Sequence, residues 1–277
     1  MVTVISKLGF LRRLVNSLAK KFGFNLARLS TSMEIREVLE LLRPRRFNGN
    51  LIRLGPNTDG GYVVPSTIHD IKLLISPGCN GQWEFEKDFH KFFKVPSLVI
   101  DALEKKPPDF DLPHKYVDAW IGSTNIGHLR TLSSILDEYV DPTSKFVLQM
   151  DIEGMEYESM IALPEARLKL AEVLIIELHY LENLLNPIFI KYIFLPFVKK
   201  LNKTHSIIFL NGNTYNDLIT LKGLKWPRVL EITAIAKNGN YIEGDLVFDY
   251  EHFSQHISNQ GGCFDNAEMY WFNHPTD

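Results

Sequence analysis

Acidic side chains and a histidine follow two apolar runs in the middle of the chain, where strands would end. Phe146–Met150 leads into Asp151 and Glu153, and Val173–Ile176 leads into Glu177 and His179. Glu177 and His179 share one side of a strand, because side chains alternate. Such a group can bind a metal ion, act as a base or hold a cationic ligand. We therefore take Asp151, Glu153, Glu177 and His179 as candidate catalytic residues, and Asp151, Glu177 and His179 as ligands if a divalent metal is used.

The alternative for the first acidic group is helix capping by Asp151, with Glu156 in the first turn of the helix. Capping explains one acid but leaves the others unexplained. For His179 the alternative is a structural role, which is the more common one for a single histidine. Its position beside Glu177, facing a second acidic strand end, makes a functional role the stronger interpretation.

A glycine-containing turn follows an earlier apolar run. Ile71–Ile75 leads into Ser76-Pro77-Gly78-Cys79-Asn80-Gly81, and a helical pattern covers Glu84–Phe93. Gly78 and Gly81 allow close approach of the backbone to a ligand, and a helix start offers unpaired N–H groups. The three-glycine dinucleotide fingerprint is incomplete, so a simple tight turn is the alternative.

An acid, Asp101, ends the next apolar run, Leu98–Ile100. It follows the glycine turn by about 20 residues, the spacing at which an acid binds ribose hydroxyls in dinucleotide-binding folds. A helix cap or a solvated loop acid is the alternative.

Arg53 and Asp59 lie close to a further turn, Asp59-Gly60-Gly61. This segment either joins two short strands or holds a carboxylate or an amine between these two charges.

Strands and helices alternate through most of the sequence, which predicts βαβ units and a doubly wound sheet. A second helix, after the N-terminal one described below, is expected over residues 32–43, with Ser32 as its candidate cap and Pro44 at its end. After about residue 207 the pattern changes to strand, turn, strand, as for an antiparallel pair closing a mostly parallel sheet. The other predicted strands are Ile207–Leu210 and Val229–Ile235, and the other helices Ile126–Tyr139, Tyr157–Leu170 with a break at Pro164, and Asn183–Leu201.

Charge and cysteine content exclude several classes of protein. Lys and Arg number 30 against 33 Asp and Glu, a net charge of −3, which argues against a nucleic-acid binder. The two cysteines, Cys79 and Cys263, cannot form a disulfide framework or a four-thiolate zinc site. A reducing compartment, the cytoplasm, is therefore expected.

The first 33 residues carry six basic side chains and no acid. Apolar residues from Val4 to Phe22 recur at three- and four-residue steps, which predicts one apolar stripe on a basic helix. Arg12-Arg13 interrupt any signal-peptide core, and no stretch supplies the ~20 apolar residues of a membrane span. Two interpretations stay open: a helix packed on the domain, and a helix of residues 1–30 lying on an anionic membrane surface. We divide the chain into this N-terminal helical segment, residues 1–45, and a catalytic domain, residues 46–277.

Taken together, these segments resemble the FkbM-type S-adenosylmethionine-dependent methyltransferases over roughly residues 50–236. The most specific piece is Met-Asp-Ile-Glu-Gly-Met-Glu, which ends at Glu156. The sequence departs from the family at Pro77, Cys79 and Asn80, where small residues are usual. The other matching pieces, in family order, are Arg53–Val64, Ser76–Phe89, Ile175–His179, residues 208–213 and Pro227–Thr233.

This resemblance implies a class I methyltransferase (Rossmann-like) α/β fold, a doubly wound seven-stranded sheet with the last strand antiparallel, here with added N-terminal helices. It also implies S-adenosyl-L-methionine as donor and O-methylation of a carbohydrate acceptor, at the inner face of the membrane if the basic helix binds there. The alternatives are a metal-dependent nucleotide-sugar glycosyltransferase and a non-catalytic nucleoside-binding domain. The cofactor-binding residues expected from the motifs and the resemblance are Arg53, Asp59, Gly60, Ser76, Gly78, Asn80, Gly81, Glu86, Asp101 and Asp151.

Overall fold

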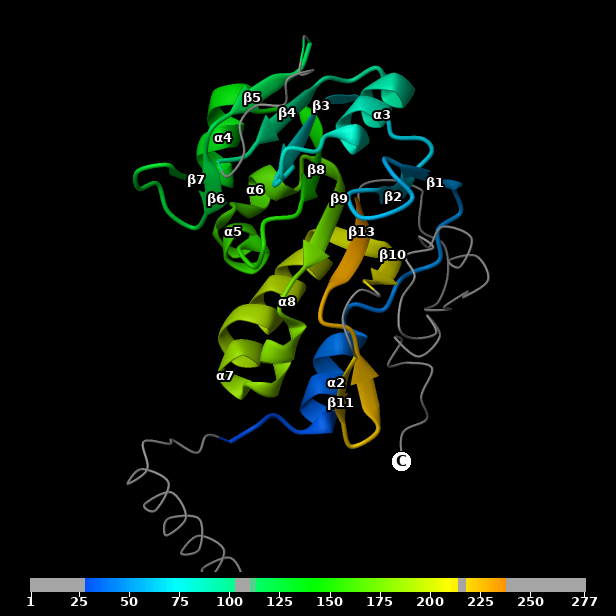
Figure 1. Ribbon diagram of the computed structural model, residues 1–277, viewed down its shortest axis with the longest axis vertical. Helices are drawn as coiled ribbons and strands as arrows, with labels where there is room; N and C mark the ends of the chain where they lie inside the picture. The colour runs from blue at the N-terminus through cyan, green and yellow to red at the C-terminus, as the bar shows by residue number, and fades with distance from the viewer. Residues whose placement is uncertain (1–27, 103–110, 112, 214–217, 238–277) are drawn as a thin grey trace, which may run out of the picture.

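The structure of the chain is a computed structural model that describes residues 28–102, 111, 113–213 and 218–237 (Figure 1). The basic helix predicted within the first 30 residues therefore lies almost wholly outside the described part, as do Cys263 and the last 40 residues. Within the described part, no helix has the length and apolarity needed to cross a membrane.

Seven strands form one sheet in the order β10-β13-β9-β8-β3-β4-β5 (Figure 1). The five strands from β9 to β5 pair in parallel, and β13 is antiparallel to both β9 and β10. The prediction of a Rossmann-like α/β sheet is confirmed, and its antiparallel strand is the last strand of the described chain. The strands are β3 (Ile71–Pro77), β4 (Ser97–Ile100), β5 (Lys115–Val117), β8 (Lys145–Met150), β9 (Ala171–Leu178), β10 (His205–Gly212) and β13 (Leu230–Ala236).

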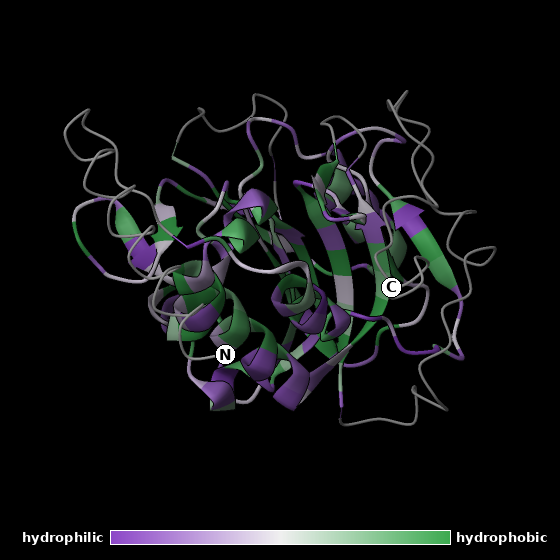
Figure 2. Cartoon of the chain, turned by 90° about the horizontal axis from the view of Figure 1, so that it is seen from below, coloured by the Kyte–Doolittle hydropathy of each residue, from purple (hydrophilic) through white to green (hydrophobic). Residues whose placement is uncertain are grey.

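Both faces of this sheet are buried. Leu148 and Leu174 belong to one apolar core, whereas their neighbours Val147 and Val173 belong to a second. Side chains alternate along a strand, so these two cores lie on opposite faces. This explains why the strands read as continuous apolar runs. Figure 2 shows the central strands mostly apolar and the outer turns of the helices hydrophilic.

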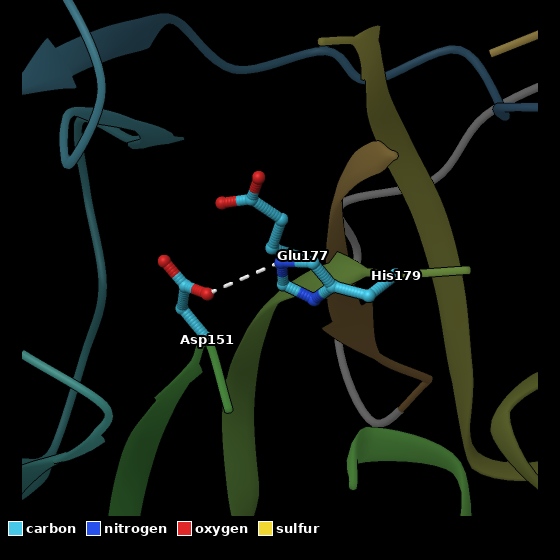
Figure 3. Close-up of side chains that lie close together, drawn as sticks. All are labelled: Asp151, Glu177 and His179. Carbon is cyan, nitrogen blue, oxygen red and sulfur yellow. Dashed lines mark ion pairs between the residues drawn. The ribbon is translucent and has the colours of Figure 1, made fainter. Parts of the chain in front are cut away.

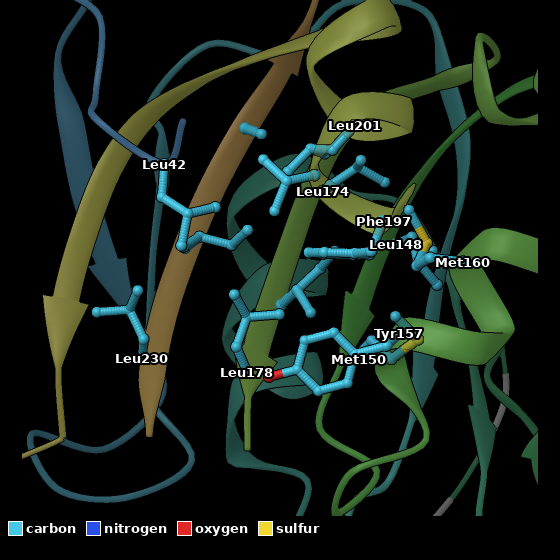
Figure 4. Packing of buried hydrophobic residues seen from close by; sticks show 14 of the residues in the cluster. Leu42, Leu148, Met150, Tyr157, Met160, Leu174, Leu178, Phe197, Leu201 and Leu230 are labelled. Carbon is cyan, nitrogen blue, oxygen red and sulfur yellow. The ribbon is translucent and has the colours of Figure 1, made fainter. Parts of the chain in front are cut away.

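Helices cover both faces of the sheet, and different helices pack on each face. The first core contains residues of α2 (Ser32–Glu40), α4 (Leu132–Tyr139), α5 (Glu156–Ala162) and α8 (Leu195–Thr204). Figure 4 shows part of this core, with the Tyr157 ring beside Leu178. The second core contains Phe85 and Phe89 of α3 (Glu84–Phe93), together with a β hairpin. The chain therefore leaves β3 through α3 toward one face and leaves β8 through α5 toward the other. Between β3 and β8 lies the topological switch point, where open α/β sheets bind ligands.

The hairpin consists of β1 (Leu51–Leu54) and β2 (Tyr62–Pro65), paired antiparallel. Asp59-Gly60-Gly61 lies in its turn, so the interpretation that this segment joins two short strands is confirmed. Thr233 of β13 donates a hydrogen bond from its hydroxyl to the carbonyl of Val63 at 2.6 Å, which fixes the hairpin to the sheet.

Helix α3 (Glu84–Phe93) has the predicted bounds, whereas the other helices differ from the prediction. Helix α2 (Ser32–Glu40) is capped by Thr31, not Ser32: the Thr31 hydroxyl accepts the N–H of Glu34, whose carboxylate accepts the N–H of Thr31. Helix α4 (Leu132–Tyr139) begins six residues after its predicted start at Ile126, because Thr131 caps it. The residues before it form β7 (Leu129–Thr131), which pairs with β6 (Trp120–Gly122).

Prolines divide the remaining predicted helices. Pro164 separates α5 (Glu156–Ala162) from α6 (Glu165–Leu168), as expected. The segment predicted as one helix over Asn183–Leu201 is a short 3₁₀ helix followed by a continuous helical run over residues 187–204, in which three stretches adjoin without a break. A proline lacks the N–H that would continue the helical bonding, and Pro187 and Pro196 each lie in a first turn. The short helix is η1 (Leu181–Leu185), and the run consists of α7 (Pro187–Phe189), η2 (Ile190–Phe194) and α8 (Leu195–Thr204).

The segment that we assigned to an N-terminal region, residues 1–45, contributes to the main core where it is described. Ile35, Leu39 and Leu42 are fully buried in the same cluster as α8 and β13. The amide of Asn202 donates to the carbonyl of Leu41 at 2.7 Å. A further two-stranded ribbon, β11 (Ile219–Leu221) with β12 (Leu224–Trp226), completes the described structure.

Candidate functional site

A cavity of about 320 Å³ lies at the carboxyl ends of β3, β4 and β8, at the switch point of the sheet. Its volume is at the lower end of the range typical of small-molecule sites. The hairpin turn, α3 and the β6 segment complete its wall. The lining residues include Asp59, Gly60, Tyr62, Gly78, Cys79, Asn80, Gln82, Glu84, Glu86, Ile100, Asp101, Ala119, Trp120, Ile121, Gln149, Asp151 and Glu153.

Gly78 lets the turn after β3 pass directly against the end of β8. It has φ +89°, and a Cβ at this position would lie 1.6 Å from the carbonyl oxygen of Asp151. Its N–H donates to Ile100 at the end of β4, and the N–H of Asp151 donates to Pro77. The glycine therefore holds three strand ends together under the cavity. Gly81, the second predicted glycine, is not on the cavity wall.

Asp101, at the end of β4, reaches back to the glycine turn. One of its carboxylate oxygens accepts the N–H of Asn80 at 2.7 Å, and its backbone carbonyl accepts the hydroxyl of Tyr116 at 2.9 Å. Asn80 has φ +47°, a conformation that Asn tolerates better than most residues. Asp101 is buried and lies on the cavity wall, as the sequence predicts.

Ser76 lies beneath the cavity floor. Its hydroxyl is fully buried between Glu86 of α3 and Gln149 of β8, whose amide oxygen is 2.5 Å away. One hydroxyl proton cannot be donated to two acceptors, so at least one of these neighbours donates to Ser76. Burial raises the pKa of Glu86 to about 7, and a protonated Glu86 supplies that donor. Ser76 thus supports the wall, which Glu86 and Gln149 themselves line.

Cys79 lies on the cavity wall and contains a nucleophilic sulfur atom. Burial raises the pKa of its thiol to about 12, which keeps it protonated at neutral pH. A thiolate reaction at this site is therefore not supported.

Asp151 lies on the cavity wall at the end of β8 and is held by Tyr62. The Tyr62 hydroxyl donates to one Asp151 oxygen at 3.0 Å. Burial raises the pKa of Asp151 to about 6, although the charge of His179 and the Tyr62 hydrogen bond act in the opposite direction. Asp151 can therefore exchange a proton near neutral pH.

His179 is buried behind Asp151. Its Nε2 is 3.6 Å from an Asp151 oxygen and 3.7 Å from a Glu153 oxygen, and its Nδ1 is 2.9 Å from Oε1 of Glu156. Burial lowers the pKa of His179, but Glu156, Asp151 and Glu153 raise it by more, so the net pKa is above the ordinary value. Glu156 begins α5 and has no exposed surface.

Glu177 lies beside Asp151 and is also buried (Figure 3). Burial, followed by the charges of Asp151 and Glu231, raises the pKa of Glu177 well above its usual value. Glu231 of β13 lies opposite Glu177 in the strand register and accepts a hydrogen bond from Asn211 at 3.0 Å. Burial raises the pKa of Glu231 to about 7. Ligand atoms of Asp151, Glu177 and His179 all lie within 4.8 Å of one another.

Arg53 supports the hairpin turn. Its guanidinium donates to the carbonyls of Pro56 and Thr58 at 3.2 and 3.0 Å. Asp59 and Gly60, at the tip of this turn, do line the cavity. The two predicted charges are therefore separated: the acid lies on the wall, and the arginine lies behind it.

The predicted site residues fall into two groups. Asp59, Gly60, Gly78, Asn80, Glu86, Asp101, Asp151 and Glu153 line the cavity. The predicted residues Arg53, Ser76, Gly81, Glu177 and His179 are not on the wall, and of these Arg53, Ser76 and His179 contact residues that are.

Sequence reasoning did not select Tyr62, Trp120, Gln149 or Glu156. Gln149 is a polar residue inside an apolar run. Because buried polar groups need hydrogen-bond partners, this position indicated a polar contact within the core. Tyr62 and Trp120 lie near no strand end that the sequence marks. Comparison with known proteins adds no further information, since no family model matches the chain and no curated protein matches it.

Proposed function

We propose that the chain is an S-adenosylmethionine-dependent methyltransferase that methylates a hydroxyl group of a carbohydrate. The acidic composition of the cavity is the observation that carries this proposal. Six acidic side chains line it, from Asp59, Glu84, Glu86, Asp101, Asp151 and Glu153, and no Lys or Arg is among its lining residues in the described chain.

This composition suits a cationic nucleoside. S-Adenosylmethionine combines a sulfonium, an ammonium group, a ribose diol and a flat purine. The acids Asp59, Asp151 and Glu153 complement the positive groups, and the apolar side chains of Ile100 and Ile121 offer contacts to a ring. A nucleotide sugar or a dinucleotide would bring a diphosphate among carboxylates with no lining cation to pair with it. The cavity charge thus favours methyl transfer over the glycosyltransferase alternative.

Asp101 is the residue that we assign to the ribose. It is a buried acid at the end of β4 that is already oriented by the N–H of Asn80. A carboxylate accepts two hydroxyl hydrogen bonds, and charge-assisted bonds of this kind are among the stronger ones. The seven-stranded sheet, with its last described strand antiparallel, agrees with the fold that the FkbM-type resemblance implies.

S-Adenosylmethionine, when bound, supplies a methyl group that is already activated by the positive sulfur. The protein must therefore orient an acceptor hydroxyl and remove its proton. Asp151 is suited to accept that proton, because it lies on the wall and burial raises its pKa to about 6. Tyr62 orients one oxygen of Asp151, and His179 faces the other. A placed base typically contributes ~10²–10⁴-fold to the rate.

A carbohydrate acceptor is supported by an exposed aromatic residue of the cavity wall. The Trp120 side chain lines the cavity yet is 49% exposed, so an apolar aromatic surface is available beside the acids. Sugars present one apolar C–H face and a rim of hydroxyl groups, and an exposed aromatic ring next to polar groups matches both.

The test is calorimetric titration of the full chain with S-adenosylhomocysteine, with a nucleotide diphosphate sugar, and with NAD. We expect only S-adenosylhomocysteine to bind, at micromolar concentration, followed by transfer of labelled methyl groups to a sugar-containing extract. Binding of the nucleotide sugar without S-adenosylhomocysteine would establish the glycosyltransferase alternative instead. Binding of S-adenosylhomocysteine without any acceptor being methylated would favour the non-catalytic nucleoside-binding domain.

A further inference from the structure

Three potential ligands converge beside the cavity from two neighbouring strands. Asp151 is the first residue after β8, Glu177 lies near the end of β9, and His179 is the first residue after β9 (Figure 3). One ligand atom of each lies within 4.8 Å of the others. Two carboxylates and one imidazole form a donor set that divalent ions of the first transition row accept.

The contact with Glu156 occupies one nitrogen of the imidazole. Nδ1 of His179 lies 2.9 Å from Oε1 of Glu156, so this hydrogen bond leaves Nε2 for another partner. Glu156 is held in turn by the N–H groups of Ile152 and Gly154, at 3.0 and 3.1 Å. Nε2 faces the carboxylates of Asp151 and Glu153. This carboxylate–histidine arrangement is the usual support for a metal-binding histidine.

Distances around Nε2 suit a shared ion better than a hydrogen bond. Nε2 lies 3.6 Å from Asp151 Oδ1, beyond hydrogen-bond length. Two ligand atoms that are ~2.1 Å from one ion, at angles of about 90–120°, lie roughly 3.0–3.6 Å apart. The observed separation is at the upper end of that range.

Glu177 provides an independent sign that a positively charged partner belongs here. Its Oε1 accepts only a 3.4 Å hydrogen bond from Asn213, and its Oε2 is buried with no hydrogen-bond partner among the described residues. Glu231 lies opposite it in the register and adds a further acid. A buried carboxylate oxygen without a donor is costly, and no lysine or arginine of the described chain forms an ion pair with Glu177 or Asp151.

We propose that Asp151, Glu177 and His179 bind one divalent transition-metal ion, such as Mn²⁺, Fe²⁺ or Zn²⁺. Three protein ligands leave coordination positions for other groups, as in catalytic metal sites. Asp151 lies on the cavity wall, so these positions adjoin the cavity, where an ion lowers the pKa of a bound hydroxyl group or water. The site does not depend on the proposed methyl transfer, since it is defined by ligand atoms alone.

The test uses Mn²⁺ and the full-length chain without any cofactor. We expect one Mn²⁺ to bind per chain, seen as loss of the free-ion electron paramagnetic resonance signal and as a rise in melting temperature. Glu177→Gln should weaken Mn²⁺ binding at least tenfold, because even indirect partners of a metal site contribute ~10–100-fold. Glu172→Gln is the matched control: the same change on the same strand, outside the cluster, should leave Mn²⁺ affinity unchanged.

Melting in the absence of metal shows whether the variant folds. Glu177→Gln keeps the size and polarity of a buried side chain and removes an acid from beside Asp151 and Glu231, so it should melt no lower than the original chain without Mn²⁺. His179→Gln serves as a second variant with the same expected loss of binding. The proposal is overturned if the original chain does not bind Mn²⁺, or if both variants bind it as tightly as Glu172→Gln does. Neither result affects S-adenosylhomocysteine titration, so the two proposals fail separately.

Discussion

Nδ1 of His179 lies 2.9 Å from Oε1 of Glu156, a carboxylate that has no exposed surface. The same oxygen accepts the N–H groups of Ile152 and Gly154. One buried atom therefore orders the loop after β8 and the histidine after β9. In this loop Glu153 and Gly154 both have positive φ, so the loop depends on such support.

Glu156→Ala should lower the free energy of unfolding by about 3–5 kcal/mol, because it leaves three N–H donors without an acceptor in the protein interior. Urea unfolding followed by circular dichroism measures this change. Glu158→Ala, two residues further along α5 and exposed, should cost less than about 0.5 kcal/mol. A similar small cost for both variants would show that Glu156 does not hold the loop.

Gly78→Ala should prevent stable folding. The new methyl group would lie 1.6 Å from the Asp151 carbonyl oxygen, a contact that neither backbone can relieve without separating β3 from β8. Gly127→Ala is the control, since Gly127 also has positive φ but a Cβ there meets nothing within 4 Å. The control should cost only ~1–2 kcal/mol, the penalty of the left-handed conformation. Soluble yield and melting temperature compare the two, and equal values would contradict the steric account.

The sequence predicted those parts of the fold that carry long regular patterns. Helix α3 has the predicted bounds, and six of the seven strands of the main sheet fall on apolar runs. Strands β6, β7, β11 and β12 have three residues each, too few for any periodicity to appear. The shortened α4 results from the Thr131 cap, whose side-chain hydrogen bond outweighs the helical spacing of the residues before it.

The candidate site was predictable where a strand end marks it. Asp101 and Asp151 directly follow apolar runs, and both lie on the cavity wall. The role of Glu156 was not predictable, because capping explains an acid in a first helical turn equally well. Only the fold brings it within reach of His179, 23 residues away. The resemblance placed Arg53 at the ligand, whereas its guanidinium donates hydrogen bonds to carbonyl groups of its own turn.

Asp101→Asn should weaken binding of S-adenosylhomocysteine at least tenfold while leaving the melting temperature nearly unchanged. The amide oxygen of Asn can still accept the N–H of Asn80, so the turn is kept, whereas the charge that strengthens hydrogen bonds to a ribose is lost. Calorimetric titration measures the affinity. Asp141→Asn, at an exposed position, is the control. Unchanged affinity in Asp101→Asn would remove Asp101 from the cofactor site.

Deletion of residues 1–27 should abolish association with anionic vesicles. The first 27 residues contain five of the six basic side chains of the N-terminal segment and no acid, and each cation near an anionic surface contributes ~1 kcal/mol. Stopping at 27 preserves the N–H of Ser30, which donates to Leu185, and the Thr31 cap of α2. The truncated chain should therefore melt at the same temperature as the full chain.

Vesicle sedimentation at low and high salt measures this association, which should weaken as salt screens the charges. Neutral vesicles are the control and should bind neither form. If the full chain ignores anionic vesicles and the truncated chain melts lower, the segment packs on the domain instead.

Glu86→Gln should change the dependence of stability on pH. Burial raises the pKa of Glu86 in the folded chain to about 7, above the usual glutamate value of 4.5. The folded state therefore binds this proton more tightly than the unfolded state, and stability falls as pH rises through the interval from about 4.5 to 7. Gln carries no charge and can donate its amide N–H to Ser76 as a protonated Glu86 does.

Between about pH 5 and pH 8 the stability of Glu86→Gln relative to the original chain should rise by about 2–3 kcal/mol. Urea unfolding at both pH values measures this difference, and other titrating groups cancel because both chains contain them. A constant difference across this range would mean that Glu86 is ionised throughout.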